Sequence, residues 1–130
     1  MIVLDTHVWI WWVDDNQRLK QSVKDRIDAD SDIRVCAISL LEIATAVSLK
    51  RLVLRPSADQ WLAVAETAAH LRVEPLTSAI CLESANLPGE FHRDPADRLI
   101  VALARSLNCE LVTADRRILE YPKVRTITAS

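Results

Sequence analysis

Glycine is almost absent from this sequence, which contains a single Gly among 130 residues. Phosphate-binding loops such as G-x-x-x-x-G-K-[ST] and G-x-G-x-x-G need several glycines, because the backbone itself must approach the phosphates. The nucleophile elbow G-x-S-x-G is absent as well. The sequence therefore excludes P-loop nucleotide binding and Rossmann-type dinucleotide binding, and it offers no motif for a serine hydrolase of the elbow type.

Cysteine is scarce and unpaired. Cys36, Cys81 and Cys109 lie far apart, are odd in number and form no C-x-x-C motif. Each lies in or beside an apolar stretch, so we expect buried free thiols in a reducing compartment rather than disulfides or zinc ligands. The three histidines show no H-E-x-x-H spacing either. The sequence thus predicts neither a disulfide framework nor a zinc site.

Excess positive charge and long apolar runs are also missing. Sixteen basic residues against 18 acidic ones give a net charge of −2, which argues against tight non-specific binding of nucleic acid but not against transient contact through a local patch. The most apolar early run, Val8–Val13, is too short to cross a membrane, and the N-terminal MIVLD has no signal-peptide pattern. We expect a cytoplasmic protein that does not contact membranes.

Half of the residues are hydrophobic, and they fall into strand-like and helix-like segments that alternate along the chain. The predicted strands are Met1–Leu4, Ile33–Ala37, Val73–Leu76, Glu110–Thr113 and, at an edge, Val124–Thr128. The predicted helical segments are the Trp-rich run after Asp5, then Arg18–Ala29, Ser39–Leu49, Ser57–Leu71, Thr77–Asn86, Asp94–Asn108 and Asp115–Glu120. This pattern predicts one α/β domain over residues 1–130, with a mostly parallel central sheet flanked by helices.

Two helices open with the capping-box pattern S/T-x-x-E/Q, in which the first side chain caps the helix and the fourth bonds back. The pairs are Ser39 with Glu42 and Ser57 with Gln60. This pattern alone is a complete structural explanation for Glu42. A catalytic role for that carboxylate must compete with it.

Four acids occupy equivalent places, each at or one turn beyond the carboxyl end of a predicted strand: Asp5, Glu42, Asp97 and Asp115. Singly, each has a structural explanation as a helix cap, a capping-box partner, an acid favoured by a helix dipole or a turn residue. Jointly they would meet at one edge of the sheet, where carboxylates repel and must be protonated or bind a cation. Oxygen ligands alone suit Mg²⁺ or Mn²⁺.

Such an ion orients or deprotonates water and neutralises charge on a phosphodiester. Four arginines neighbour the acids in sequence and are candidates for contacts with the phosphates of such a substrate: Arg93, Arg98, Arg116 and Arg117. His7 and His92 also lie close to acids in sequence and can support them.

Four segments, MIVLDTHVWIWW, ISLLEIA, HRDPADRLIVALA and LVTADRRIL, resemble the PIN-domain ribonucleases, specifically the VapC-like toxins of type II toxin–antitoxin systems. They follow the order and spacing of that family over essentially the whole chain. The resemblance implies a Mg²⁺- or Mn²⁺-dependent endoribonuclease whose catalytic and metal-binding acids are Asp5, Glu42, Asp97 and Asp115. It further implies supporting roles for Asp94 and for the hydroxyls of Thr6, Ser39 and Thr113.

The same resemblance implies a homodimer that is silenced by a cognate antitoxin protein, which would lay a segment along a groove beside the active site. The helix after Asp5 carries Trp9, Trp11 and Trp12. These rings do not share one narrow helical face. Core packing explains them, and a groove wall that binds a partner is the alternative, because Trp is enriched in interface anchors.

Two other functions remain open. A phosphatase-type hydrolase could use Asp5 as a nucleophile, but that chemistry wants D-x-D, and the third position here is His7. A non-catalytic α/β interaction module would use the acids only as helix caps. It predicts no binding of divalent metal.

Overall fold

The computed structural model describes all residues, 1–130. In chain order the elements are β1 (Ile2–Leu4), α1 (Thr6–Val13), α2 (Gln21–Asp28), β2 (Ile33–Cys36), α3 (Ile38–Ser48), α4 (Ala58–Glu66), β3 (Leu71–Glu74), α5 (Ser78–Ala85), α6 (Pro95–Ser106), β4 (Glu110–Thr113), α7 (Arg116–Leu119) and β5 (Thr126–Thr128). None of the helices combines the length and apolarity needed to span a membrane.

The strands form one five-stranded sheet in the order β3-β2-β1-β4-β5, and every neighbouring pair is parallel. Strand β1 lies in the centre, where Leu4 is opposite Val35 of β2 and Val112 of β4. All of β1 is fully buried, as expected for a parallel strand covered on both faces. The predicted fold class is confirmed, and β5 lies at an edge as expected.

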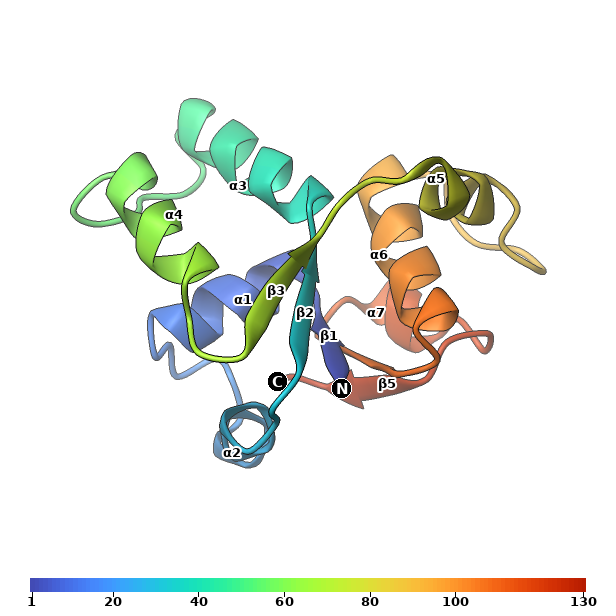
Figure 1. Cartoon of the computed structure of the whole chain (residues 1–130), viewed down its shortest axis with the longest axis horizontal. Coiled ribbons are helices and arrows are strands. Elements are labelled where there is room, and N and C mark those ends of the chain that lie inside the picture. The colour runs from blue at the N-terminus through green and yellow to red at the C-terminus, as the bar shows by residue number, and fades with distance from the viewer.

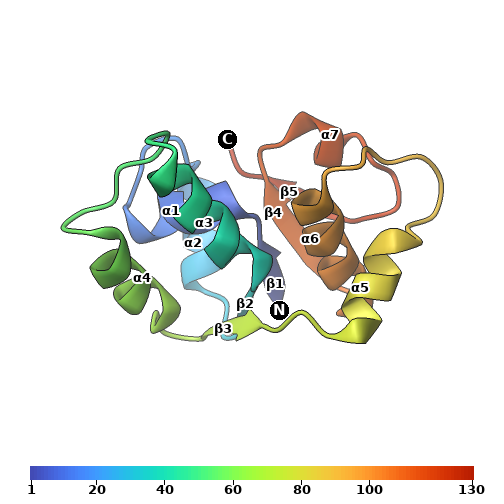
Figure 2. The ribbon, with the colours of Figure 1, turned by 90° about the horizontal axis from the view of Figure 1, so that it is seen from above.

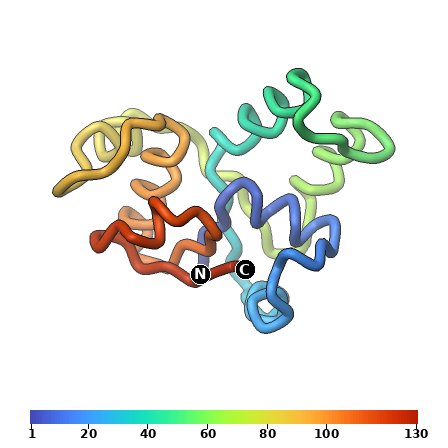
Figure 3. Tube along the Cα trace, turned by 180° about the vertical axis from the view of Figure 1, so that it is seen from behind, coloured from blue at the N-terminus to red at the C-terminus, as the bar shows by residue number.

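Helices cover both faces of the sheet. Figure 1 shows α1, α3 and α4 on one side of the strands and α5, α6 and α7 on the other. The view from above in Figure 2 gives the same separation. Seen from behind, the blue-to-green half of the chain lies opposite the orange-to-red half (Figure 3). The chain therefore completes one half of the layered structure before it builds the other.

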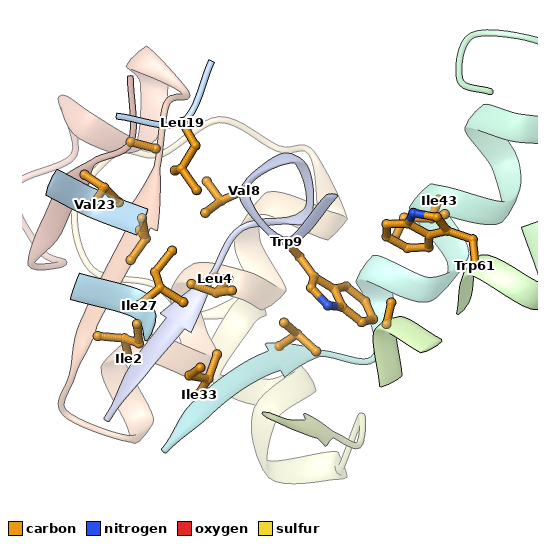
Figure 4. Close-up of a cluster of buried hydrophobic side chains, with 14 of the residues drawn as sticks. Ile2, Leu4, Val8, Trp9, Leu19, Val23, Ile27, Ile33, Ile43 and Trp61 are labelled. Atoms are coloured by element: carbon orange, nitrogen blue, oxygen red, sulfur yellow. The ribbon is translucent and has the colours of Figure 1, made fainter. Parts of the chain in front are cut away.

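The alternation of side chains along β1 divides the core into two parts. Ile2 and Leu4 point to the side of α1 and α2, where they pack with Val8 and Ile27; Figure 4 shows this cluster. Val3 points to the opposite side and belongs to the cluster formed largely by α6. Burial on both faces fixes the strand register, because a slip of one residue would exchange the two sets.

The tryptophans of α1 divide between the core and the surface. Trp9 is fully buried, and its ring centroid lies 6.2 Å from that of Trp61 on α4, as Figure 4 shows. Core packing is therefore confirmed for Trp9. Trp11 and Trp12 are partly exposed, and Trp12 Nε1 donates to Asp28 Oδ1 at 2.8 Å. Only these two rings could form part of a groove wall.

Two predicted helices are shorter than expected. Helix α2 begins at Gln21 instead of Arg18, and α4 ends at Glu66 instead of Leu71. The Thr67 hydroxyl donates back to carbonyls of the last turn of α4, and His70 adopts a left-handed φ of 65°. A left-handed residue cannot continue a right-handed helix. The apolar residues beyond Thr67 therefore do not extend the helix, and the predicted end at Leu71 is wrong.

Strand β3 covers Leu71–Glu74 rather than the predicted Val73–Leu76. Its register pairs Leu71 with Ile33 of β2. Pro75 follows at once and has no N–H to donate to a ladder, so the strand ends before it. The prediction for the cysteines is also corrected: Cys36 and Cys109 are buried free thiols, but Cys81 is exposed.

Candidate active site

The acids predicted from the sequence come together in one cleft at the carboxyl edge of the sheet. The cleft has a volume of about 330 Å³, and its lining includes five carboxylates: Asp5, Glu42, Asp94, Asp97 and Asp115. The chain runs from β1 outward to β2 and β3, then returns to place β4 on the other side of β1. Open α/β sheets bind ligands at such a switch point, beside helix N-termini.

Asp5 sits deepest in this cleft, with only 3% of its surface exposed. It caps α1, where its Oδ1 accepts from the Thr6 backbone N–H at 2.9 Å. Its Oδ2 accepts from the Thr113 hydroxyl at 2.6 Å. Thr113 is fully buried and also accepts the Asp115 backbone N–H at 3.0 Å. One hydroxyl thus connects Asp5 to the backbone of Asp115, the first and the last of the predicted site acids.

Glu42 does not belong to a capping box, and this corrects the sequence prediction. Helix α3 begins at Ile38, so Ser39 already lies inside it, and no side chain caps its start. The Thr6 hydroxyl donates to Glu42 Oε1 and lies 2.7 Å from Ser39 Oγ. Because Thr6 has one hydroxyl proton, Ser39 donates to Thr6 in turn. Glu42 is therefore oriented from α1, and its structural explanation as a cap partner is removed.

Asp94 and Asp97 open α6 as predicted. Asp94 is the N-cap, Pro95 is the first helical residue, and the Asp97 backbone N–H donates to Asp94 Oδ1 at 3.1 Å. The Asp97 side chain is nearly buried, and its Oδ2 lies 2.6 Å from His92 Nε2. His92, predicted as a supporting residue, thus contacts an acid directly. The local cap explains the helix start but leaves the Asp97 carboxylate aimed into the cleft.

The cleft disfavours ionised carboxylates. Burial raises the pKa of Glu42 above its ordinary value, and the negative charges of Asp5, Asp97 and Asp94 raise it further. Burial likewise raises the pKa of Asp97, with a further rise caused by Asp5, Asp94 and Asp115. Both shifts follow from desolvation and like-charge repulsion. A cation in the cleft would reverse both effects.

The donor set is made of carboxylate oxygens, which hard ions such as Mg²⁺ and Mn²⁺ prefer. No three acid, histidine or cysteine side chains of the chain are grouped closely enough to ligate a single ion in this geometry. Repulsion among carboxylates that no cation neutralises favours such spacing. The residues present fit an oxygen-liganded ion in kind.

The predicted arginines have four different surroundings. Arg117 is the only lysine or arginine in the cleft lining, and its Nη2 lies 3.5 Å from both Asp97 Oδ2 and Asp115 Oδ2. Arg93 is exposed, and Arg116 is exposed with a 3.7 Å contact to Glu120. Arg98 points inward and donates to three backbone carbonyls, those of Ser84, Phe91 and His92. The structure therefore gives Arg98 a role in holding the loop before α6.

Replacing Arg98 by lysine should lower the free energy of unfolding by about 1–2 kcal/mol, because an ammonium cannot reproduce the three bonds of a guanidinium fork. Chemical denaturation would measure the change. The matched control is Arg116→Lys, whose side chain is 89% exposed and whose replacement should change stability by less than about 0.5 kcal/mol. Equal stability of the two variants would contradict a structural role for Arg98.

The apolar wall of the cleft was not predicted from the sequence. It consists of Ile10, Ile43, Ala46 and Leu52. Ile10 and Ala46 follow Thr6 and Glu42 by four residues, and residues at that spacing share a helix face. Helical spacing could therefore have identified these two. Leu52 lies in a loop after α3, and no periodic signal marks it.

Comparison with known proteins assigns the chain to a family. The PIN-domain family profile matches residues 2–124. Ribonuclease VapC22 of Mycobacterium tuberculosis is 35% identical over 127 residues, which cover 98% of this chain and 96% of that protein.

Solved structures share the fold at low sequence identity. A chain of VapBC2 from Rickettsia felis, bound to a DNA fragment from their promoter, superposes with a TM-score of 0.73 at 15% identity and full coverage of both chains. DNA-bound VapBC from Salmonella typhimurium gives 0.71 at 22% identity, covering 98% of this chain and 96% of that one. The sarcin–ricin-loop-cleaving toxin VapC20 of M. tuberculosis gives 0.61 at 17%, covering 96% and 99%. These structures share the fold, and the family profile together with the VapC22 match shows that the chain belongs to the PIN-domain family.

Proposed function

We propose that this protein is a divalent-metal-dependent endoribonuclease and the toxin of a toxin–antitoxin pair. The observation that carries the proposal is the meeting of Asp5, Glu42, Asp97 and Asp115 in one cleft of a PIN-domain chain. The relative of 35% identity is named a ribonuclease, and VapC20 is described as a toxin that cleaves the sarcin–ricin loop. Both descriptions support RNA as the substrate.

Asp5 and Asp97, with Glu42 and Asp115, would hold one or two Mg²⁺ or Mn²⁺ ions, and Asp94 would add negative charge at the rim. A bound ion supplies an activated water and stabilises the negative charge that develops on the phosphodiester. The hydroxyls of Thr6, Ser39 and Thr113 orient Glu42 and Asp5 before any ion arrives. Hydrogen bonds behind the ligands hold them in place and tune their affinity.

Arg117 is the best placed of the arginines to bind RNA. Its side chain is 61% exposed and stands at the mouth of the cleft, between Asp97 and Asp115. A cation that neutralised the carboxylates would leave this guanidinium free to contact a phosphate oxygen of the substrate. Arg93 and Arg116 lie near the cleft in sequence and are exposed for weaker contacts.

The proposed antitoxin would cover part of α1. Trp12 lines a surface depression of about 410 Å³ together with Val13 and the exposed Val64. Trp9 is excluded from such contact because it is fully buried, so Trp12→Ala is the informative variant: it should weaken antitoxin binding while the protein still folds, and unchanged binding would count against this surface. A homodimer remains part of the proposal, and light scattering on the purified chain would test it.

The two rival functions fare differently against the geometry. Asp5, Asp94 and Asp115 do cap helices, as an interaction module would require, but Glu42 caps nothing. A nucleophilic Asp5 is disfavoured because the D-x-D pattern is missing, with His7 rather than a second aspartate at the third position. Binding of a divalent metal separates the enzyme from the module. Burst release from a small phosphate ester would revive the phosphatase.

The direct test is cleavage of a mixed pool of structured RNAs by purified protein that has been freed of any antitoxin. We expect cutting with Mg²⁺ or Mn²⁺ and none with chelator. An Asp97→Asn variant purified in parallel detects contaminating nuclease, because contaminants would persist in that preparation. No cutting and no metal binding by the wild-type protein would refute the proposal.

A further inference from the structure

His7 is a cleft residue that the proposed chemistry does not use. It is the second residue of α1 and lines the cleft beside Asp5 and Thr6. Its ring Nε2 accepts the backbone N–H of Ala114 at 3.0 Å. Ala114 lies between Thr113, the last residue of β4, and Asp115. A side chain on the first helix thus binds the backbone of the connection that leads to Asp115.

This hydrogen bond determines which ring nitrogen carries the proton. Nε2 accepts an N–H and therefore holds no proton, so the neutral ring is protonated at Nδ1. Nδ1 lies 3.7 Å from Asp5 Oδ2. The same imidazole therefore directs its Nδ1–H toward Asp5 while its Nε2 binds the backbone next to Asp115.

Two backbone amides fix the path of the chain between β4 and α7. The Ala114 N–H is bound by His7, and the Asp115 N–H is bound by the Thr113 hydroxyl at 3.0 Å. Without His7 the first of these donors has no partner, and a partly buried N–H without a partner is costly. The connection would then move to reach water and would take the Asp115 carboxylate with it.

We infer that His7 is a positioning residue, whose Nε2 holds the Ala114–Asp115 connection so that Asp115 and Asp5 face the same point in the cleft. The part of the inference that concerns metal and RNA rests on the proposed function, whereas the hold on the backbone does not. The competing explanation is that His7 serves only to pack against Trp11, because the two rings are in edge-on contact, with centroids 5.0 Å apart and planes at 65°.

Two substitutions separate these roles. In His7→Gln the side-chain Oε1 is as many bonds from Cα as Nε2 is, so the acceptor is kept and the ring is lost. In His7→Phe the ring is kept and the acceptor is lost. The probe is MnCl₂ alone, titrated by calorimetry, together with hydrogen exchange of the Ala114 and Asp115 amides. RNA cleavage, resolved into kcat and KM, is measured separately.

We expect His7→Phe to bind Mn²⁺ about tenfold more weakly, the usual effect of removing a residue that orients a metal ligand. Its Ala114 amide should exchange faster, and its kcat should fall more than its KM changes. His7→Gln should keep most of the wild-type affinity, exchange protection and kcat. Thermal melts confirm that both variants fold.

The opposite ranking, a native-like His7→Phe beside an impaired His7→Gln, would show that the ring packs and nothing more. Equal losses in both variants would also overturn the inference, because the acceptor would then be insufficient. If the wild-type protein neither binds Mn²⁺ nor cleaves RNA, the proposed function fails. The exchange rates of the Ala114 amide would still decide whether His7 holds the connection.

Discussion

Asp97→Asn is expected to reduce RNA cleavage by about 10³-fold, equivalent to about 4 kcal/mol of transition-state stabilisation. Asp97 is nearly buried, opens onto the cleft from the first turn of α6 and is bound by His92. Asparagine keeps the shape and the helix start, since the cap comes from Asp94. It removes one of the charges that would hold the metal. Single-turnover cleavage with Mn²⁺ measures the loss.

The same substitution should stabilise the metal-free protein, by roughly 1 kcal/mol. The pKa of Asp97 is raised by burial and by the neighbouring acids, so the ionised form costs folding free energy at neutral pH. Conversely, Mn²⁺ at about 100 times its dissociation constant should stabilise the wild-type protein by about 2.7 kcal/mol. In Asp97→Asn that gain should largely disappear. Chemical denaturation of the wild-type protein and of the variant, each in chelator and in Mn²⁺, gives the four free energies of unfolding that are compared.

The pH dependence of stability should show the same destabilising effect of ionised carboxylates in the cleft. Glu42 and Asp97 both have a raised pKa in the folded protein, so the folded chain binds protons more tightly than the unfolded one. The stabilisation that these two carboxyls contribute in chelator should therefore fall as the pH rises from about 4, the ordinary carboxyl value, through the raised values. Carboxyls with a lowered pKa, those of Asp28, Asp30, Asp32 and Asp59, contribute the opposite dependence, so the test is the difference between the wild-type protein and the variant. Asp97→Asn should flatten this fall. The exposed control Glu66→Gln should leave it unchanged, and a wild-type protein whose stability is indifferent to Mn²⁺ would favour the interaction module.

Thr113→Val is expected to lower the free energy of unfolding by about 2 kcal/mol, although it conserves volume. The Thr113 hydroxyl is fully buried, donates to Asp5 Oδ2 and accepts from the Asp115 N–H. Valine leaves a buried carboxylate oxygen without its donor and a backbone N–H without its acceptor. Cleavage should fall as well, because Asp5 and Asp115 lose their common partner. Urea denaturation and cleavage assays measure the two losses.

Thr113→Ser restores the hydroxyl and should recover most of the activity, with only the cost of a lost methyl group. Thr128→Val on the exposed part of the edge strand β5 is the matched control, and it should change stability by less than about 0.5 kcal/mol. If Thr113→Val were as stable and as active as the control, the hydroxyl would have no part in arranging the acids.

Features that depend on neighbours in sequence were determined by the sequence alone. Asp94, Pro95 and Asp97 predict the start of α6 because a helix cap needs only the correct residues within one turn. The strand-like segment Glu110–Thr113 predicts β4 with the observed bounds. The alternation of strands and helices was sufficient to predict a parallel α/β fold. The parallel fold in turn predicts that the acids, which follow the strands, lie at the carboxyl edge of the sheet.

The tertiary structure decided what depends on residues far apart in the chain. The S-x-x-E pattern at Ser39 predicts a local helix cap. In the structure the Ser39 hydroxyl and the Glu42 carboxylate both contact Thr6, more than 30 positions earlier. His7 grips Ala114 across 107 positions, and Thr113 holds Asp5 across 108. No local pattern encodes such contacts, because parallel strands that are distant in the chain become neighbours only when the sheet assembles. The sequence determined which acids could meet, and the assembled sheet decided how they are held.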